Sequence, residues 1–286
     1  MEVRLEYLRP RQIEEAIAAR PVLFMPLGTI EWHGLHNTVG LDTLKVHELC
    51  IRAAREGGGL VMPPLYGGMG GLNEPYTFVI EPEDSYTSRL LEPWLERQCA
   101  EAIRLGFRAV IMLTGHYGPS QQLIVRETAV RMTRILHRPI LGTPEHFLAL
   151  DEGYFGDHAA FFETSLMMHL LPESVELGEL GEAPHQGVYG RDPRQYANAA
   201  DGKRLAEVIV GRLVRLARQM PEWDDCTVER FVRAEGELVA RQFLLGGREG
   251  PIDAAWRRSP DGALDAYPEF LTEGRFEELI ELYQRL

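Results

Sequence analysis

The chain has little cysteine and no closely spaced cysteine pair. Its 286 residues include only Cys50, Cys99 and Cys226. Because no C-x-x-C pair occurs, the sequence excludes the usual thiolate metal site and a disulfide framework. We expect buried or neutral thiols, with a catalytic nucleophile as the minor alternative.

Long apolar runs and an excess of basic residues are also missing. No segment approaches the roughly 20 apolar residues that a membrane-spanning helix needs, and the first residues are charged throughout, unlike a signal peptide. The formal net charge is −13 at pH 7, so most of the surface would repel nucleic acid or an anionic membrane. We therefore expect a cytoplasmic protein that binds neither.

The overall composition is that of an ordinary globular protein. Apolar residues make up 45% and charged residues 26% of the chain, which is typical of soluble domains. The length allows one large α/β domain or two smaller ones. We favour a single domain over residues 1–286, in which residues 221–286 form a C-terminal extension that mixes strand-like and helical pieces.

Short apolar runs alternate with helical patterns along the chain. Strands are predicted at residues 21–27, near residue 60, at 107–116 and at 138–144. Helices are predicted at residues 42–56, 86–105, 119–137, from Glu163 onward and at 201–220. This alternation predicts an α/β fold, a three-layer α/β/α sandwich with a mostly parallel sheet. Ligands then collect at the carboxyl ends of the strands.

Residue types that bind metals are concentrated directly after the first predicted strand. Residues 28–43 read GTIEWHGLHNTVGLDT. Glu31 and His33 are two positions apart, so an extended backbone places both side chains on the same side. A carboxylate beside an imidazole forms half of a metal site. Asp42 either bridges two ions or caps the helix that follows.

Two later segments supply further candidates. His116 ends the third predicted strand and should therefore lie at the same edge of the sheet. The segment GDHAAFFETS contributes Asp157, His158 and Glu163, the last at a helix start where a glutamate also suits the helix dipole. Each residue alone has a structural explanation, and we infer a metal site from their convergence.

Some neighbouring residues are candidates for supporting roles. Those that we consider for substrate contact are Trp32, Tyr76 and Tyr117. Packed or exposed aromatic side chains without a ligand are commoner for all three, and Trp32 is more often a core or subunit-contact residue. We expect His36 to support the metal ligands by hydrogen bonding rather than to bind metal itself.

Four segments, in this order, resemble the creatininase family. GTIEWHGLHNTVGLDT is similar to its metal-binding signature, G-[ST]-x-E-x-H-G-x-H followed by an aspartate. TGHYG resembles the N-G-H motif, HAAFFETS resembles H-A-G-x-x-E-T-S, and GVYGRDPRQYANAADGKRL resembles the G-V-x-G-D-P segment. The resemblance spans about residues 15–220, and four ordered motifs make it specific.

The resemblance implies a creatininase-like metal-dependent hydrolase that acts on a small cyclic or formylated amide. It implies one or two divalent ions per subunit, Zn, Mn or Fe, and a homo-oligomer, often a hexamer. The metal ligands that it implies are Glu31, His33, Asp42, His116 and Glu163. The catalytic residues that it implies are His158, for proton transfer, and Glu163.

The chain departs from this family on the side where substrate binds. Creatininase has a glutamate for the second metal two residues after the strand-end histidine, and here Gly118 occupies that position. We therefore expect a substrate other than creatinine and a second metal site that is completed by Glu163, weak or empty. Two other functions stay open: carbon–carbon cleavage of a ring ketone such as a keto-inositol, and a non-catalytic binding module.

Overall fold

A parallel sheet runs through the part of the chain that the computed structural model describes, residues 1–72, 75–82, 88–181, 186–246 and 264–285. The strands of this described part are β1 (Val22–Leu27), β2 (Leu60–Val61), β3 (Ala109–Thr114) and β4 (Ile140–Pro144). They are ordered β2-β1-β3-β4, and every neighbouring pair is parallel. The predicted parallel sheet is confirmed.

The two central strands are apolar throughout because both of their faces are covered. Every residue of β1 and β3 is buried, as expected for a parallel sheet with helices on both sides. Their register pairs Val22 with Ala109 and Leu27 with Thr114. Both strands therefore end at the same level, and the segments that leave them start side by side.

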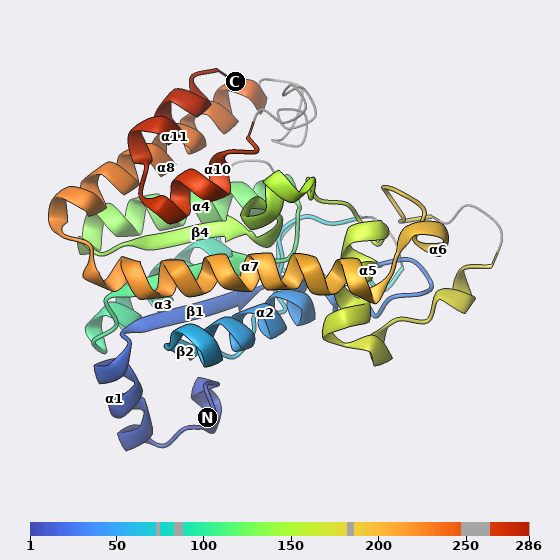
Figure 1. Cartoon of the computed structure of the whole chain (residues 1–286), viewed down its shortest axis with the longest axis horizontal. Coiled ribbons are helices and arrows are strands. Elements are labelled where there is room, and N and C mark those ends of the chain that lie inside the picture. Colours follow the sequence, from blue (N-terminus) through green and yellow to red (C-terminus); the bar gives the residue numbers. More distant parts are fainter. Residues whose placement is uncertain (73–74, 83–87, 182–185, 247–263, 286) are drawn as a thin grey trace.

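Helices cover both faces of the sheet (Figure 1). The α-helices are α1 (Pro10–Ala19), α2 (Leu41–Gly57), α3 (Leu91–Arg104), α4 (Pro119–Leu136), α5 (Phe161–Leu170), α6 (Pro193–Tyr196), α7 (Ala199–Gln219), α8 (Asp225–Gly246), α10 (Tyr267–Glu273) and α11 (Phe276–Tyr283). The 3₁₀ helices are η1 (Leu5–Tyr7), η2 (Glu145–Glu152), η3 (Pro172–Ser174), η4 (Leu177–Leu180) and η5 (Met220–Glu222). No helix within the described ranges is long and apolar enough to cross a membrane.

Alternate residues of β1 belong to two separate hydrophobic clusters. Val22 and Phe24 pack with α2 and α7, whereas Leu23 and Met25 pack with α3 and α4. This alternation follows from the two-residue period of a strand. It confirms the predicted three-layer α/β/α sandwich.

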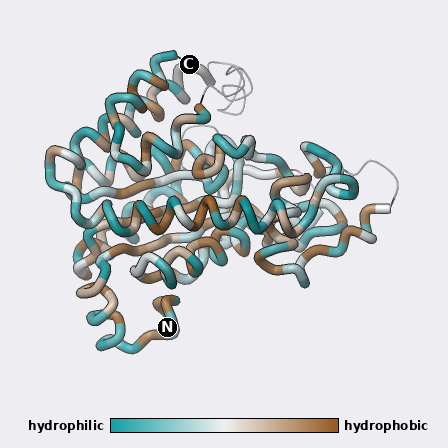
Figure 2. The backbone as a smooth tube through the Cα atoms, in the orientation of Figure 1, coloured by the Kyte–Doolittle hydropathy of each residue, from teal (hydrophilic) through white to brown (hydrophobic). Residues whose placement is uncertain are grey.

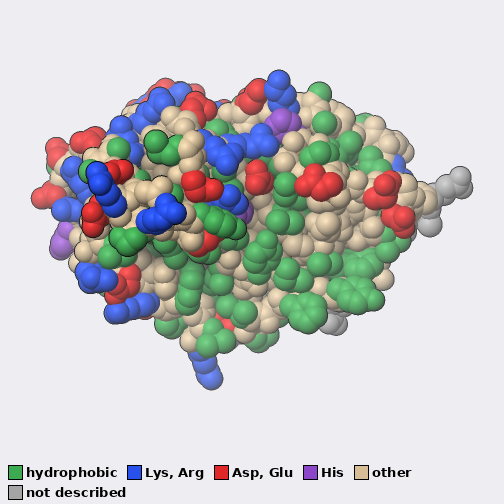
Figure 3. All heavy atoms as spheres, turned by 90° about the horizontal axis from the view of Figure 1, so that it is seen from below, with side chains coloured by type: hydrophobic (Ala, Val, Ile, Leu, Met, Phe, Trp, Pro, Cys, Tyr) green, Lys and Arg blue, Asp and Glu red, His purple; other side chains and the backbone are tan. Residues whose placement is uncertain are grey.

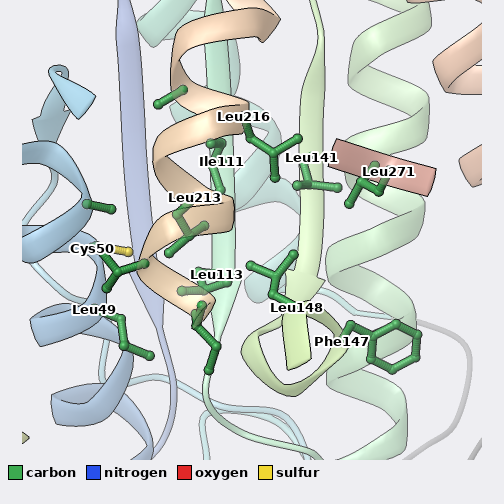
Figure 4. Packing of buried hydrophobic residues seen from close by; sticks show 14 of the residues in the cluster. Leu49, Cys50, Ile111, Leu113, Leu141, Phe147, Leu148, Leu213, Leu216 and Leu271 are labelled. Atoms are coloured by element: carbon green, nitrogen blue, oxygen red, sulfur yellow. The ribbon is translucent and has the colours of Figure 1, made fainter. Parts of the chain in front are cut away.

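Helix α7 buries one apolar stripe against the sheet. Hydrophobic and hydrophilic stretches alternate along it (Figure 2), as expected for a helix with one buried face. Leu213 and Leu216 project toward Ile111 and Leu113 of β3 and Leu141 of β4 (Figure 4). All five side chains are buried, so α7 anchors one outer layer of the sandwich.

The described part of residues 221–286 is helical, and the strand-like pieces that we expected there are not found in it. Apolar residues recur every three or four positions, as in Phe276, Leu279 and Tyr283, which is the period of a helix face. These side chains are buried in the same cluster as α7. The division into one domain with an extension stays a prediction.

The buried cysteines behave as predicted. Burial raises the pKa of the Cys50 thiol well above its ordinary value, and burial, aided by Glu96, raises the pKa of Cys99 to about 12. Both thiols are therefore neutral near pH 7. Cys226 is exposed and free.

Candidate metal centre

The predicted metal ligands meet at the carboxyl ends of β1 and β3. Glu31 and His33 lie in the segment that leaves β1, and His116 lies two residues beyond the end of β3. Asp42 and Glu163 lie in the first turns of α2 and α5. All five are almost completely buried, so four separate segments bring polar side chains into one protected centre.

Asp42 bridges two histidines and does not cap α2, so the N-cap interpretation is wrong. The N-cap is Gly40, which makes no side-chain capping bond. The Asp42 carboxylate lies 3.1 Å from His33 Nε2 through Oδ1 and 3.1 Å from His116 Nδ1 through Oδ2. This approach needs Gly115, where an added Cβ would lie 2.0 Å from the carbonyl oxygen of Asp42.

The ligand atoms fall into two groups that share Asp42. The first ligand group is Glu31, Asp42 and His116, and the second ligand group is His33, Asp42 and Glu163. Within each group the ligand atoms lie within 4.8 Å of one another. Such a shared carboxylate is the arrangement that bridges two cations, and Glu163 supplies a carboxylate in the second ligand group.

The candidate ligand atoms are buried against one another, which fits a divalent ion. Glu31 Oε2 lies 2.9 Å from His116 Nδ1, and His33 Nε2 lies 3.1 Å from Asp42 Oδ1. Burying several carboxylates together is costly unless a cation compensates them, and carboxylate oxygens and imidazole nitrogens are suitable ligands for Zn, Mn or Fe.

The centre attracts positive charge. Burial lowers the pKa of His33, but Asp42 and two further carboxylates outweigh burial and raise it to about 9. The pKa of His116 is likewise above its ordinary value, since Glu31 and Asp42 outweigh burial. Without a metal both imidazoles therefore carry protons near pH 7, and a divalent ion would replace those protons.

Neighbouring groups hold the ligand side chains in place. Glu31 Oε1 accepts a hydrogen bond of 2.6 Å from the backbone N–H of Leu72, and the Glu31 carbonyl oxygen lies 3.0 Å from His33 Nδ1. His36 Nε2 lies 3.1 Å from Thr164 Oγ1, and His36 belongs to none of the ligand groups of the described residues. His36 thus contacts the residue that follows Glu163, and its supporting role stays a prediction.

His158 lies beside the ligands with one ring nitrogen already engaged. Its ring stacks on His33 at 4.3 Å between centroids, and its Nε2 lies 2.7 Å from the carbonyl oxygen of Trp32. Because a carbonyl oxygen only accepts, Nε2 donates there and leaves Nδ1 to accept a proton. Burial and His33 lower the pKa of His158, so the ring is neutral near pH 7. Together with Glu31 and His33 it also forms a third potential ligand group.

The three aromatic candidates for substrate contact separate into two places. Trp32 donates through Nε1 to the carbonyl oxygen of Gln186 at 3.1 Å and stacks on Tyr76. Tyr76 is 68% exposed. The Tyr117 hydroxyl instead points into a buried network, where it lies 2.6 Å from the Tyr154 hydroxyl. Their roles toward substrate stay predictions.

The sequence patterns did not point to Lys45, a buried lysine next to the second ligand group. Lys45 Nζ lies 2.7 Å from Glu145 Oε1 and 2.7 Å from Glu163 Oε1, and the hydroxyls of Tyr117 and Tyr154 also contact Glu145. Burial lowers the pKa of Lys45, but these carboxylates outweigh it and keep the ammonium charged. One signal was available: Lys45 lies three residues after Asp42, on the buried face of α2.

Comparisons with known proteins agree with this geometry. The family description "Creatininase: Creatinine amidohydrolase" matches residues 6–217. Creatinine amidohydrolase of Pseudomonas putida is 28% identical over 198 residues, 61% of this chain and 74% of the relative. A mutant creatininase of Zn-Zn type is similar at a TM-score of 0.63 and 25% identity, over 77% of this chain and 99% of the other. The structure "Creatininase Mn" is similar at a TM-score of 0.61 and 25% identity, over 77% of this chain and 100% of the other.

Proposed function

Since the chain belongs to the creatininase family of metal-dependent amidohydrolases, we propose that it hydrolyses a small cyclic or formylated amide other than creatinine, using divalent ions held by the two ligand groups. The observation that supports this most directly is the sharing of Asp42 by the two groups. The metal-dependent relatives named above have Zn-Zn or Mn in their descriptions, and Zn and Mn are accordingly the metals to test first.

The chain's own residues supply positioning and proton transfer. A divalent ion in this centre lowers the pKa of water and polarises a carbonyl oxygen. Glu31, held by the Leu72 backbone N–H, and Asp42, held between two histidines, fix the positions of the ligands. His158 Nδ1 accepts a proton and returns it to the leaving nitrogen, a role that suits a neutral imidazole.

The identity of the amide rests on differences around the centre. Gly118 provides no side chain where the resemblance implies a glutamate, and the Tyr117 hydroxyl is engaged with Lys45. The change at position 118 lies next to His116 and alters the surroundings that a substrate meets. We therefore propose that the substrate is a small amide of different shape from creatinine.

We also propose that the chain forms a homo-oligomer, a hexamer by resemblance. Large apolar side chains near the centre are exposed, among them Leu35, Phe78 and Tyr189. Hydrophobic side chains gather over a broad part of one face (Figure 3). Extensive exposed apolar surface is typical of protein–protein contacts. Sedimentation should give a mass well above the 32.4 kDa of one chain.

The decisive experiment combines metal analysis with a substrate screen. The purified protein is stripped of metal, reloaded with Zn²⁺, Mn²⁺ or Fe²⁺ separately, and assayed on cyclic amides, formamides and creatinine. We expect hydrolysis of a non-creatinine amide that disappears on stripping and returns on reloading. Asp42→Asn should lose both metal and activity, because the ligand groups share this carboxylate.

A matched control separates loss of a ligand from loss of any carboxylate. Glu207→Gln removes a carboxylate that pairs with Lys203 on the surface of α7, and this variant should retain metal and activity. Stripped and reloaded protein with equal activity, or with none on any amide, would argue against the proposed function. Turnover of creatinine above all other amides would contradict the substrate proposal alone.

A further inference from the structure

The carboxylate of the second ligand group already neutralises a cation of the protein. Glu163 Oε1 lies 2.7 Å from Lys45 Nζ, and Glu163 Oε2 accepts a hydrogen bond of 2.8 Å from the Ala159 backbone N–H. Lys45 has no solvent exposure. Both oxygens of Glu163 therefore already accept hydrogen bonds, and the strong charge-assisted bond from Lys45 competes with a metal ion for this carboxylate.

The first ligand group is not compensated in this way. The ion pairs of Glu31 and Asp42 are with histidines, which lose their protons when they bind a metal. Glu31 Oε2 lies 2.9 Å from His116 Nδ1, and Glu31 Oε1 accepts a hydrogen bond from the Leu72 backbone N–H, so no lysine or arginine pairs with this carboxylate in the described part of the chain. In the first ligand group, the carboxylates of Glu31 and Asp42 are therefore both available to a cation. In the second ligand group, Asp42 is shared with the first, and Glu163 is paired with Lys45.

Position 118 cannot add a carboxylate to the second ligand group. A Cβ at Gly118 would lie 2.5 Å from His116 Nε2 and 2.8 Å from the Met69 carbonyl oxygen. Real Cβ atoms are not found so close to other heavy atoms. The packing of the segment after β3 therefore requires glycine, and the second ligand group has no further donor from this position.

Glu145 keeps the ammonium of Lys45 in this place. Its Oε1 lies 2.7 Å from Lys45 Nζ and also accepts a hydrogen bond of 3.1 Å from the Tyr154 hydroxyl. A buried lysine with two carboxylate partners retains its charge, since removing the proton would leave both carboxylates uncompensated. The positive charge is thus a fixed part of the centre, close to where a second divalent ion would bind.

We propose that Lys45 supplies the positive charge at the second ligand group, so that each chain holds one divalent ion tightly, in the first ligand group, and binds a second only weakly. This inference rests on the proposed metal-dependent function. The physical reason is repulsion between the ammonium and a second cation, which is strong where water is excluded. Lys45 acts on metal occupancy and not on the reacting atoms.

Metal stoichiometry tests this proposal. Metal-free protein is saturated with Mn²⁺, dialysed against metal-free buffer and analysed for bound Mn²⁺, and calorimetric titration gives the dissociation constants. The parent should retain one Mn²⁺ per chain. The variant Lys45→Met/Glu145→Gln removes the ammonium together with its counter-charge, and its second Mn²⁺ should bind about tenfold or more tightly than in the parent, the scale of effects from residues behind the ligands.

The single variant Glu145→Gln is the matched control. It leaves Lys45 beside Glu163 and should retain one Mn²⁺ per chain. Electron paramagnetic resonance of the loaded parent gives a second readout that needs no variant, and we expect the spectrum of isolated Mn²⁺ ions.

Each contrary result has its own meaning. Two tightly held Mn²⁺ ions in the parent, a coupled two-ion spectrum, or a second dissociation constant that the double variant leaves unchanged would overturn the role of Lys45. Failure of the parent to bind any divalent ion would overturn the proposed function and this inference with it.

Discussion

At the scale of single residues, chemistry in this centre depends on which ring nitrogen is left free. His158 donates through Nε2 to the Trp32 carbonyl oxygen, so Nδ1 is the nitrogen left for the proton transfer that we propose. His33 and His116 instead direct nitrogens at the Asp42 carboxylate, and their raised pKa values mark them as cation-binding positions. Burial alone therefore does not assign a role to a histidine here.

Replacing His158 should separate proton transfer from metal binding. We expect His158→Ala to retain its metal and to lose about 10²–10⁴-fold in kcat, the usual contribution of a positioned acid or base. Metal analysis and steady-state kinetics on the amide found in the screen measure the two effects. A His158→Ala protein depleted of metal would instead assign this ring to the third ligand group.

The buried ring of His146 should make the metal-free protein sensitive to acid. Burial, Lys45 and Arg126 hold the pKa of His146 well below its ordinary value, so the folded protein keeps this ring neutral. The unfolded chain binds a proton there below about pH 6.5. The free energy of unfolding therefore falls as the pH decreases from 7 to 5, by up to about 1.4 kcal/mol per pH unit from this group.

The variant His146→Gln removes this titration and keeps a side chain of similar size. Urea unfolding of parent and variant between pH 5 and 7, both without metal, should show a smaller pH dependence for the variant. Other histidines contribute equally to both proteins, so the difference between the two curves reports His146. Parallel curves would show that its pKa is not lowered on folding.

At the scale of elements, one buried arginine ties the C-terminal helices to the sandwich. Arg126 of α4 pairs with Glu235 of α8 at 3.4 Å and donates to Thr143 of β4 at 3.2 Å. Its guanidinium also lies 4.2 Å from the centre of the Phe147 ring. Helix, strand and C-terminal segment thus meet at one charged group that has no access to water.

Breaking this pair from one side should cost more stability than removing it whole. Arg126→Met leaves Glu235 buried without its cation, and we expect a loss of about 3–5 kcal/mol in the free energy of unfolding. In Arg126→Met/Glu235→Gln no charge is left unpaired, and the loss should be smaller. Urea unfolding measures the free energy of unfolding of both variants. Equal decreases in the two variants would show that the ion pair itself is stabilising.

At the scale of the whole molecule, the described C-terminal helices complete the core instead of hanging from it. Phe231, Tyr267, Leu271 and Tyr283 are buried in the same cluster as α2 and α7. Such a large buried side chain contributes about 1.5–3 kcal/mol, and the net stability of a domain is only about 5–15 kcal/mol. Loss of the described C-terminal helices should therefore remove most of the free energy of unfolding.

A chain that ends at Met220 should fail to form a stable fold. Its sandwich would expose the apolar side chains that α8, α10 and α11 cover, and we expect aggregation or a large loss of helical circular dichroism. Soluble yield and thermal unfolding, compared with those of the full chain, measure this. A truncated protein with the parent's thermal stability would show that residues 221–286 form an independent unit.

The sequence by itself determined the parallel strands, the helices that follow them and the strand ends at which the candidate metal ligands lie. These features are local: apolar runs mark buried strands, and Glu31, His33 and His116 follow such runs directly. Asp42 and Glu163 each also had a structural explanation at a helix start, and the resemblance implied metal binding for both. Within the C-terminal segment, the helical spacing of Phe276, Leu279 and Tyr283 covers a helix of only 8 residues, and so short a pattern did not distinguish helix from strand.

Only the tertiary structure decided which distant charges meet. Lys45 and Glu163 are 118 residues apart, and Arg126 and Glu235 are 109 apart, so no periodicity links them. Taken alone, a lysine or a glutamate within a helix is expected in solvent, because burial of an isolated charge is prohibitive. A charged side chain is buried only where the fold places the opposite charge beside it. Asp42 likewise pairs with His33 and His116 instead of capping α2. These ion pairs form only once β1, β3 and α2 have packed together.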